Sequence, residues 1–254
     1  MSLREFPGLI RQLPQHKPWV IAIGVITVAV FLGACSFGTW TLLRSEENVG
    51  DVLPTSTIVK RDISTRDIDS VPMTVADVFP DEQIVATDGA VYPRIGPVQA
   101  SEDCRGAATR GEVRNLLASM CSQMIRASFV SADSRYFLTA GILNLPSLAE
   151  ATTFSRQVAA ATSESGTLAG YNSDAAVQIL YSGPARVTME VRGHFLLYVV
   201  VVRQDGKKLD ETDNTGVEII SYDILKKYLR DTVMATWETD TSAMSEPSEA
   251  AATG

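Results

Sequence analysis

The chain has 254 residues, with 22 basic and 30 acidic side chains, and 45% of its residues are apolar. This length suits one ordinary domain with accessory segments and excludes a large multidomain machine. The net charge of −8 and the pI near 4.9 argue against a nucleic-acid-binding protein, because phosphate binding requires clustered Lys and Arg. We therefore expect no nucleic-acid partner.

The most apolar part of the chain is residues 19–43, a run of 25 residues without a charge. At 1.5 Å per residue, a helix of this length crosses a hydrocarbon core of about 30 Å. Residues 1–18 are basic, whereas the chain becomes acidic after Arg44, so the positive-inside rule places residues 1–18 in the cytoplasm. We expect a single-pass protein of the cell membrane that contacts the lipid bilayer through residues 19–43 and has its C-terminal domain outside.

Two alternatives use the same residues. The segment Leu32 to Cys35 is similar to the lipobox of bacterial lipoproteins, which would leave Cys35 as the lipid-carrying residue after cleavage. Against this, the apolar run continues eight residues beyond Cys35, where a lipoprotein usually turns polar. Ordinary signal-peptide cleavage is the third possibility. All three place the following domain on the outer side of the membrane.

The part outside the membrane divides into three segments. Residues 44–71 are rich in Ser, Thr and Asp without helical periodicity and predict an extended extracytoplasmic linker. Residues 238–254 have Met244 as their one large apolar side chain and predict a disordered tail. The domain then covers residues 72–237. Prolines interrupt the chain up to residue 95 and predict irregular structure there.

The first half of the domain predicts a helix, a hairpin and a second helix. Apolar residues from Val113 to Ile125 recur at helical spacing behind a capping box of Thr109 and Glu112. Two apolar runs, 127–130 and 136–145, flank a polar turn and predict antiparallel strands. A second capping box, Ser147 with Glu150, predicts a helix to about Ala161.

The second half predicts a short strand over 177–181, a long strand over 186–203 and a closing helix over 221–237. The odd positions of the long strand form an apolar row, and Gly193 marks a bulge or bend within it. This order of elements predicts an α+β fold, with an antiparallel sheet of about four strands packed with three helices.

The two cysteines outside the membrane segment, Cys104 and Cys121, predict a disulfide in an oxidising compartment. The loop they close would stabilise the fold by about 3 kcal/mol in the chain-entropy model. The alternative is a pair of free buried thiols. Zinc would need two further ligands, and no His or other Cys lies nearby, so we expect no metal or cofactor.

Catalytic signatures are absent from the sequence: it has no G-x-S-x-G, H-E-x-x-H, P-loop or dinucleotide motif. Glu190, Arg192 and His194 share one face of the predicted long strand and form the candidate binding face. The alternatives for these residues are a solvated sheet face and a hydrolase in which His194 acts as the base. The acidic residues of the loop 210–213 predict a solvated charge run.

Several features together resemble a known class of protein. They are the basic N-terminus, the single apolar span, the cysteine helix, the Leu-Thr-Ala-Gly strand at 138–141 and the Gly-His-Phe-Leu-Leu-Tyr-Val strand at 193–199. The chain resembles uncharacterised single-pass envelope membrane proteins of actinomycetes. The resemblance implies a location in the cell envelope and transfers no activity.

The function expected from the sequence is therefore binding rather than catalysis. We expect a membrane-anchored extracytoplasmic module that binds an envelope protein or a cell-wall ligand. The alternatives are an envelope hydrolase that uses His194 and a structural subunit of a membrane complex. The sequence leaves the ligand, the oligomeric state and the cellular process open.

Overall fold

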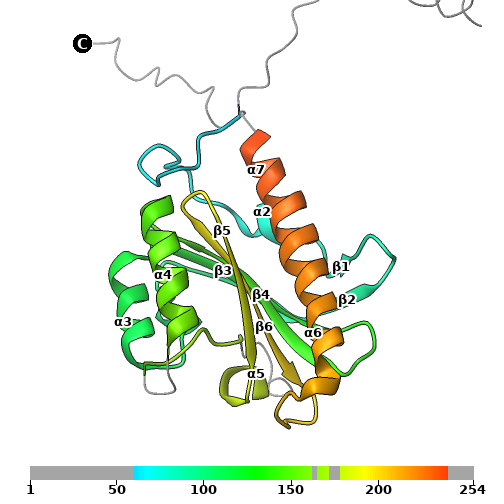
Figure 1. Cartoon of the computed structure of the whole chain (residues 1–254). Helices are drawn as coiled ribbons and strands as arrows, with labels where there is room; N and C mark the ends of the chain where they lie inside the picture. Colours follow the sequence, from blue (N-terminus) through cyan, green and yellow to red (C-terminus); the bar gives the residue numbers. More distant parts are fainter. Residues whose placement is uncertain (1–59, 162–164, 172–177, 240–254) are drawn as a thin grey trace, which may run out of the picture. The chain divides into compact units, whose positions relative to one another are not determined.

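The computed structural model of the chain describes residues 60–161, 165–171 and 178–239. Residues 19–43, Cys35 and most of the predicted linker and tail lie outside this part. Within it, no helix combines the length and the apolar character needed to cross a bilayer. The described residues belong to one compact unit, in which helices pack on a curled antiparallel sheet (Figure 1).

The sheet has six strands in the order β1-β2-β3-β4-β6-β5, and every neighbouring pair is antiparallel. The strands are β1 (Gln83–Val85), β2 (Val91–Ser101), β3 (Gln123–Val130), β4 (Tyr136–Asn144), β5 (Arg186–Arg192) and β6 (Phe195–Arg203). The predicted α+β class with an antiparallel sheet is confirmed. The sheet is larger than the four strands expected.

The helices are α2 (Val75–Val78), α3 (Gly111–Met120), α4 (Leu148–Ala160), α5 (Ile179–Ser182), α6 (Asn214–Ile220) and α7 (Ala235–Thr239). Short 3-10 turns form η1 (Cys104–Ala107) and η3 (Glu211–Asp213). A π-helical stretch, η4 (Ser221–Met234), joins α6 to α7. We refer to α6, η4 and α7 together as the C-terminal helix.

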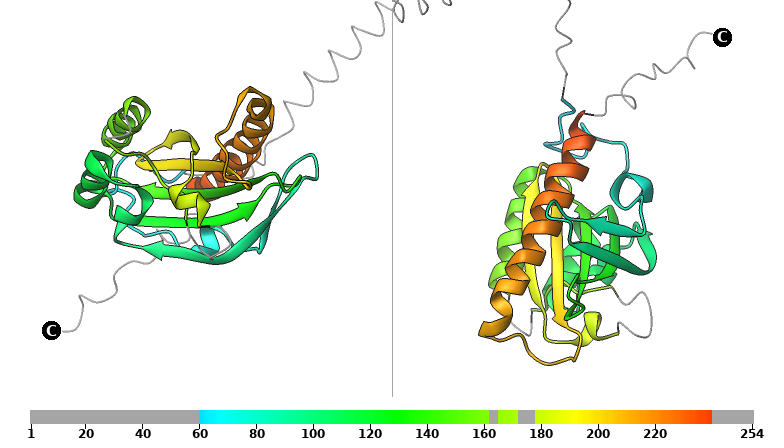
Figure 2. Two further views of the ribbon diagram at one scale, coloured as in Figure 1. Left: turned by 90° about the horizontal axis from the view of Figure 1, so that it is seen from below. Right: turned by 90° about the vertical axis from the view of Figure 1, so that its right-hand side faces the viewer.

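The central strand β6 is buried on both of its faces. Its odd residues, from Phe195 to Val201, join a core cluster with the C-terminal helix. Its even residues, from Leu196 to Val200, join a second cluster with α3 and α4. Figure 2 shows α3 and α4 on one side of the curled sheet and the C-terminal helix on the other. Burial on both faces explains why the second half of the strand predicted over 186–203 is apolar at every position.

Strands β1 and β2 occupy the region that the prolines predicted to be irregular. Pro93 and Pro97 both lie in β2, and the register of β2 with β3 shifts between Ile95 and Gln99. Proline is tolerated near a sheet edge because a missing backbone N–H costs little where the ladder is already interrupted. Residues 67–82 are irregular apart from α2, as predicted, whereas the prediction was wrong for β1 and the first residues of β2.

The predicted long strand over 186–203 is a hairpin. Arg192 pairs with Phe195, so Gly193 and His194 form a two-residue turn between β5 and β6. Gly193 has a φ of +58°, as expected for the first central residue of a type II′ turn. A Cβ at Gly193 would lie 2.1 Å from the carbonyl oxygen of Ile63, so the approach of that segment also requires glycine. The glycine reverses the chain rather than bending it.

The helix predicted over 109–125 is shorter at both ends. It begins at Gly111, and the Thr109 hydroxyl bonds to Thr167 instead of capping the helix. Met124 and Ile125 belong to β3, because the backbone turns extended at Cys121. Met124 and Ile125 are apolar because they are buried in the sheet, and their position after α3 matches helical spacing only by chance.

The remaining predictions have mixed outcomes. The β3–β4 hairpin is confirmed, and the Ser147 hydroxyl caps α4 by accepting a hydrogen bond from the N–H of Glu150. The strand predicted over 177–181 was wrong, since residues 179–182 form α5. The closing helix begins at Asn214, seven residues earlier than predicted. Residues 60–71 of the predicted linker pack on the domain, where Ile63 and Asp69 are buried.

The Cys104–Cys121 disulfide is present, with 6.0 Å between the two Cα atoms. It joins the first residue of η1 to the residue that follows α3. The bridge therefore ties the segment after β2 to the end of α3, and the second core cluster includes both cysteines.

Candidate functional site

The predicted binding face, Glu190, Arg192 and His194, does not exist as one surface. His194 lies in the turn between β5 and β6 and is fully buried, with 0% of its surface exposed. Glu190 bonds to Arg230 and Arg192 bonds to Glu238, so both side chains point toward the C-terminal helix. The prediction assumed a continuous strand, and the reversal at Gly193 removes the alternation on which the shared face depended.

His194 is the centre of a buried polar cluster. Its Nε2 lies 3.2 Å from Asp69 Oδ2, and its Nδ1 lies 3.0 Å from Asn144 Oδ1 and 3.1 Å from the carbonyl oxygen of Leu145. The indole Nε1 of Trp237 donates to the same Asp69 oxygen at 2.9 Å. The cluster thus joins residues before the sheet, the β5–β6 turn and the end of the C-terminal helix.

A histidine beside a carboxylate is also the arrangement of a general base and its orienting acid. Here both ring nitrogens already face acceptor atoms, and none of those atoms belongs to a hydroxyl or a thiol. The ring has no access to solvent in this conformation. The geometry therefore favours a role in holding the three segments together over attack on a substrate.

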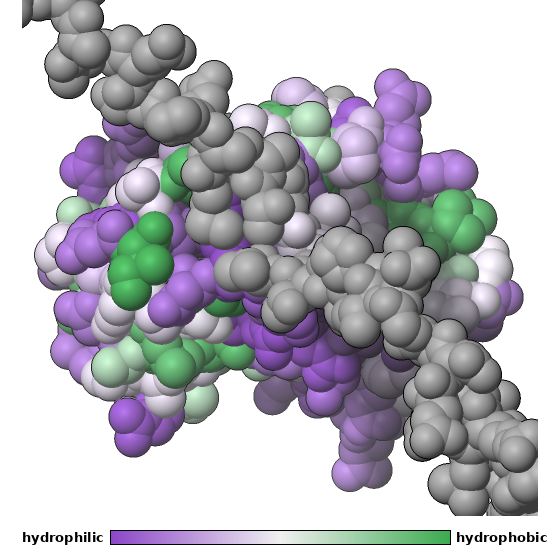
Figure 3. Space-filling model, turned by 90° about the horizontal axis from the view of Figure 1, so that it is seen from above, coloured by the Kyte–Doolittle hydropathy of each residue, from purple (hydrophilic) through white to green (hydrophobic). Residues whose placement is uncertain are grey.

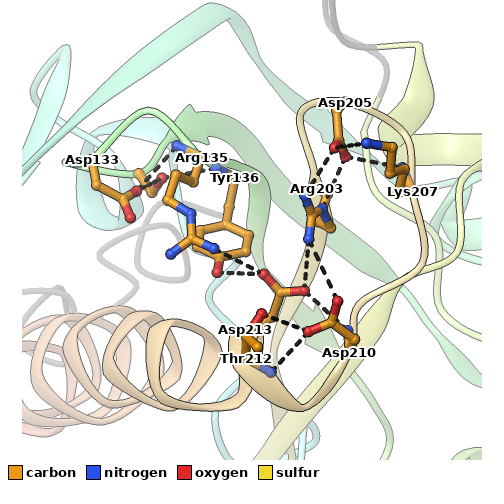
Figure 4. A network of polar contacts seen from close by, with 10 residues as sticks. Asp133, Arg135, Tyr136, Arg203, Asp205, Lys207, Asp210, Thr212 and Asp213 are labelled. Carbon is orange, nitrogen blue, oxygen red and sulfur yellow. Dashed lines mark hydrogen bonds and ion pairs between the residues drawn. The ribbon is translucent and has the colours of Figure 1, made fainter.

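A second polar cluster centres on Asp213, at the end of η3 (Figure 4). The Asp213 carboxylate is 1% exposed and accepts hydrogen bonds from Tyr136 Oη at 2.8 Å and from Arg203 Nη1 at 3.2 Å. The backbone N–H of Asp210 also donates to it, at 3.0 Å. Arg135 approaches the same carboxylate from the β3–β4 turn. The residues predicted as a solvated charge run include this buried anchor, which the local sequence did not reveal.

The electrostatics of this cluster follow from those contacts. The pKa of Asp213 is lowered, first by the backbone N–H of Asp210 and then by Tyr136 and Arg203. Burial, followed by the hydrogen bond to Asp213, raises the pKa of Tyr136 to about 12. A cavity of about 400 Å³ opens beside Arg135, Arg203 and Asp205, but its charged groups are bonded to one another. The cluster is an ion-pair network that fixes the start of the C-terminal helix.

A groove runs along the C-terminal helix from Val217 to Lys226. A cavity of about 300 Å³ lies between β5 and this helix, lined mainly by Arg186, Thr188, Tyr222, Leu225 and Lys226. A second cavity, of about 420 Å³, lies on the other side of Tyr222, near Thr87. Tyr222, which is 51% exposed, borders both cavities, and Ile219, which is 50% exposed, borders the second one. Exposed apolar groups beside a hollow are typical of binding surfaces.

A larger cavity, of about 540 Å³, lies beside Thr109, Gly166 and Tyr181, but apart from Tyr181 its lining residues are small or polar. Seen from above, the visible apolar residues form separate spots among polar ones (Figure 3). Within the described ranges, no group of three or more His, Cys, Asp and Glu side chains is arranged to hold a metal ion. The groove beside β5 is therefore the candidate functional site.

Comparison with known proteins gives no relative: no family model matches the chain, and neither a curated protein nor a solved structure matches it.

The sequence contains a signal for the groove in the spacing of its exposed apolar residues. Ile219 and Tyr222 are three residues apart and share one side of a helix whose other side carries the buried Ile220 and Ile224. A helix with apolar residues on two sides has more apolar surface than one core contact requires. That pattern would have indicated the region if the helix had been predicted to begin at residue 214.

The burial of His194 predicts a stability effect in place of the neutral one that an exposed residue would show. We expect His194→Ala to lower the free energy of unfolding by about 2–4 kcal/mol, because it opens a cavity and leaves Asp69 short of a donor. Urea unfolding of both proteins measures this change. Lys208→Ala, at an exposed position, serves as the control and should stay within about 0.5 kcal/mol. A folded His194→Ala protein of unchanged stability would contradict the contacts described.

The Asp213 network predicts a pH-dependent effect. At pH 7 we expect Asp213→Asn to lower the free energy of unfolding by about 2 kcal/mol, because a neutral amide cannot accept from the four donors that face the carboxylate. The folded pKa of Asp213 is lowered, so its contribution is complete above the unfolded value near 4 and is lost as the pH falls further. Unfolding curves at pH 7, 5 and 3 should show the two proteins converging only at the lowest pH. Asp81→Asn, at an exposed carboxylate, is the control, and a difference that persists unchanged at pH 3 would contradict this account.

Proposed function

We propose that this chain is a membrane-anchored, extracytoplasmic binding module of the bacterial cell envelope, without catalytic activity. The observation that carries the proposal is the groove between β5 and the C-terminal helix, where Tyr222 and Ile219 remain exposed beside a cavity. A soluble domain rarely leaves large apolar side chains around a hollow without a ligand for it.

The location rests on two independent features. The Cys104–Cys121 disulfide is typical of proteins in an oxidising compartment outside the cytoplasm. The uncharged run of residues 19–43, with basic residues on its N-terminal side, supplies an anchor of the matching orientation. Together they support a cytoplasmic N-terminus, a single span and an outer domain.

The alternative of a hydrolase that uses His194 has less support. It requires the His194 ring to exchange its contacts with Asn144 and Asp69 for a nucleophile and a substrate. The burial of that ring and its three acceptor contacts oppose such an exchange. The binding module needs no rearrangement, because its groove is already open.

Reporter fusions test the location. A reporter placed after residue 60 should be active only if it is of the type that works outside the cytoplasm, because the span is expected to export everything that follows it. Fusions within residues 1–18 are the matched control and should give the opposite result. The intact mass of the extracted protein distinguishes the anchors, since loss of residues 1–34 with an added lipid on Cys35 indicates a lipoprotein. Cytoplasmic activity after residue 60 would contradict the proposal.

Photocrosslinking in intact cells tests the binding role. A photoreactive amino acid at Tyr222 should give a reproducible crosslinked band, because this side chain borders the groove. Ile68 is 60% exposed and does not line the groove, so it is the control position. Crosslinks at Tyr222 without crosslinks at Ile68 support the proposal. Equal labelling at both positions, or none at either, contradicts it.

A further inference from the structure

The strand β5 forms one edge of the sheet and pairs only with β6. In a hairpin with a two-residue turn, the residues flanking the turn exchange hydrogen bonds, and alternate residues of each strand do the same. Arg192 flanks the turn, so Glu190, Thr188 and Arg186 bond to β6. The backbone N–H and C=O groups of the residues between them, Val187, Met189 and Val191, point outward.

Those outward groups lack hydrogen-bond partners among the described residues, since their contacts along the chain are confined to the β5–β6 ladder. Edges are usually blocked by proline, lysine or a short strand. The opposite edge follows this rule, because β1 has three residues and the neighbouring β2 contains two prolines. β5 has seven residues and contains neither proline nor lysine. Its edge is therefore open to a further strand.

The helices beside β5 limit which kind of polypeptide can supply an added strand. The apolar row of β5, from Val187 to Val191, packs with the cluster that includes α4, and the C-terminal helix covers the other face. Figure 2 (left) shows these helices on the two sides of β5. Edge-to-edge pairing of two copies would bring their flanking helices together, and packed helices need about 8–10 Å between their axes. A single extended segment carries no such helices and meets no such obstacle.

The groove specifies the chemistry of that segment. A residue opposite Thr188 would point toward the C-terminal helix, into the cavity of about 300 Å³ formed by Tyr222 and Leu225. This volume suits one large apolar side chain. Arg186 lies on the same face two residues away, and among the described residues its side chain bonds to the neutral amide of Asn214 and to no carboxylate. Arg186 and Lys226 outnumber the single carboxylate of Glu218 in this cavity, so an acidic side chain is favoured there.

The chain's own tail does not fit this requirement. Its one large apolar residue, Met244, is five residues beyond the end of α7 at Thr239. Five extended residues span about 17 Å, whereas the helix between Tyr222 and Thr239 is about 25 Å long at 1.5 Å per residue. Met244 therefore cannot return to the cavity, and the tail is excluded as the added strand.

We infer that the edge of β5 binds an extended segment of a partner polypeptide as an added antiparallel strand, with a large apolar side chain opposite Thr188 and an acidic side chain two residues later, opposite Arg186. The inference rests on the proposed binding function and identifies its site and its ligand class. Backbone hydrogen bonds to Val187 and Met189 supply the affinity, and the two side chains supply the selectivity.

Synthetic peptides test the inference on the full-length protein in detergent. The probe is the acetylated, amidated peptide TVTLTETVT, in which leucine and glutamate occupy the required positions. N-methylation of the two threonines that flank the leucine removes the N–H groups that face β5 and should weaken binding at least about tenfold. N-methylation of the leucine and the glutamate should change it by less than about threefold. The reversed order, TVTETLTVT, should bind more weakly than the probe.

Protein variants locate the site. Tyr222→Ala should weaken binding of the probe about tenfold, whereas Ile68→Ala, at an exposed position outside the groove, should change it by less than about twofold. Arg186→Gln should remove the preference for glutamate over glutamine in the probe, because the unpaired guanidinium is its source. Both Tyr222 and Arg186 are exposed, so the variants should fold as the parent does, which thermal unfolding checks.

Hydrogen exchange supplies the decisive readout. The amides of Val187, Met189 and Val191 should exchange freely without the peptide and become protected with it. Protection before any peptide is added would show that another segment of this chain, such as residues 45–59, covers the edge, and would overturn the inference. Equal binding of both N-methylated peptides, or no binding of the probe, would also overturn it. Crosslinks at Tyr222 in cells would then keep the binding module and reject only strand addition.

Discussion

Burial of β6 on both faces is the constraint on which the rest of the fold depends. A strand whose odd and even residues are all apolar requires cover on both sides, and no single helix can supply it. The chain meets this need with α3 and α4 on one face and with the C-terminal helix on the other. The order of the elements follows: α3 and α4, before β5, cover one face, and the chain after β6 returns across the opposite one.

The buried polar groups lie where the cover joins the sheet. Asp69 and His194 connect the residues before α2, the β5–β6 turn and Trp237 near the end of the C-terminal helix. Asp213 does the same at the start of that helix, through Tyr136 and Arg203. Each end of the helix is thus fixed by a buried carboxylate that accepts several hydrogen bonds. Apolar packing is not directional, so these directional hydrogen bonds fix the orientation of the helix on the sheet.

The same arrangement leaves β5 incomplete. Its faces are covered by α4 and the C-terminal helix, but its outer edge has no neighbouring strand among the described residues. A groove and an open row of backbone groups therefore lie side by side. The proposed binding function and the inferred strand addition both derive from this one feature, and the described His194 cluster contributes by holding the hairpin in place.

The features that depend on local patterns could be predicted from the amino-acid sequence. The capping box at Ser147, the β3–β4 hairpin and the apolar row of β6 arise from spacing along a few residues, and the structure contains all three. The pairing of Cys104 with Cys121 also followed, because the domain offered one pair of cysteines. The α+β class with an antiparallel sheet was a consequence of these elements taken in order.

The features that depend on contacts between distant segments could be seen only in the tertiary structure. Gly193 reverses the chain because Ile63, 130 residues earlier, lies against it, and no local pattern contains that contact. Because of the same reversal, His194 is buried in the turn and does not share a surface with Glu190 and Arg192. The open edge of β5 is likewise a property of strand order, since a strand's residues do not say which neighbours it will have. Local periodicity determines which residues are buried, whereas topology determines which backbone groups remain free to bind.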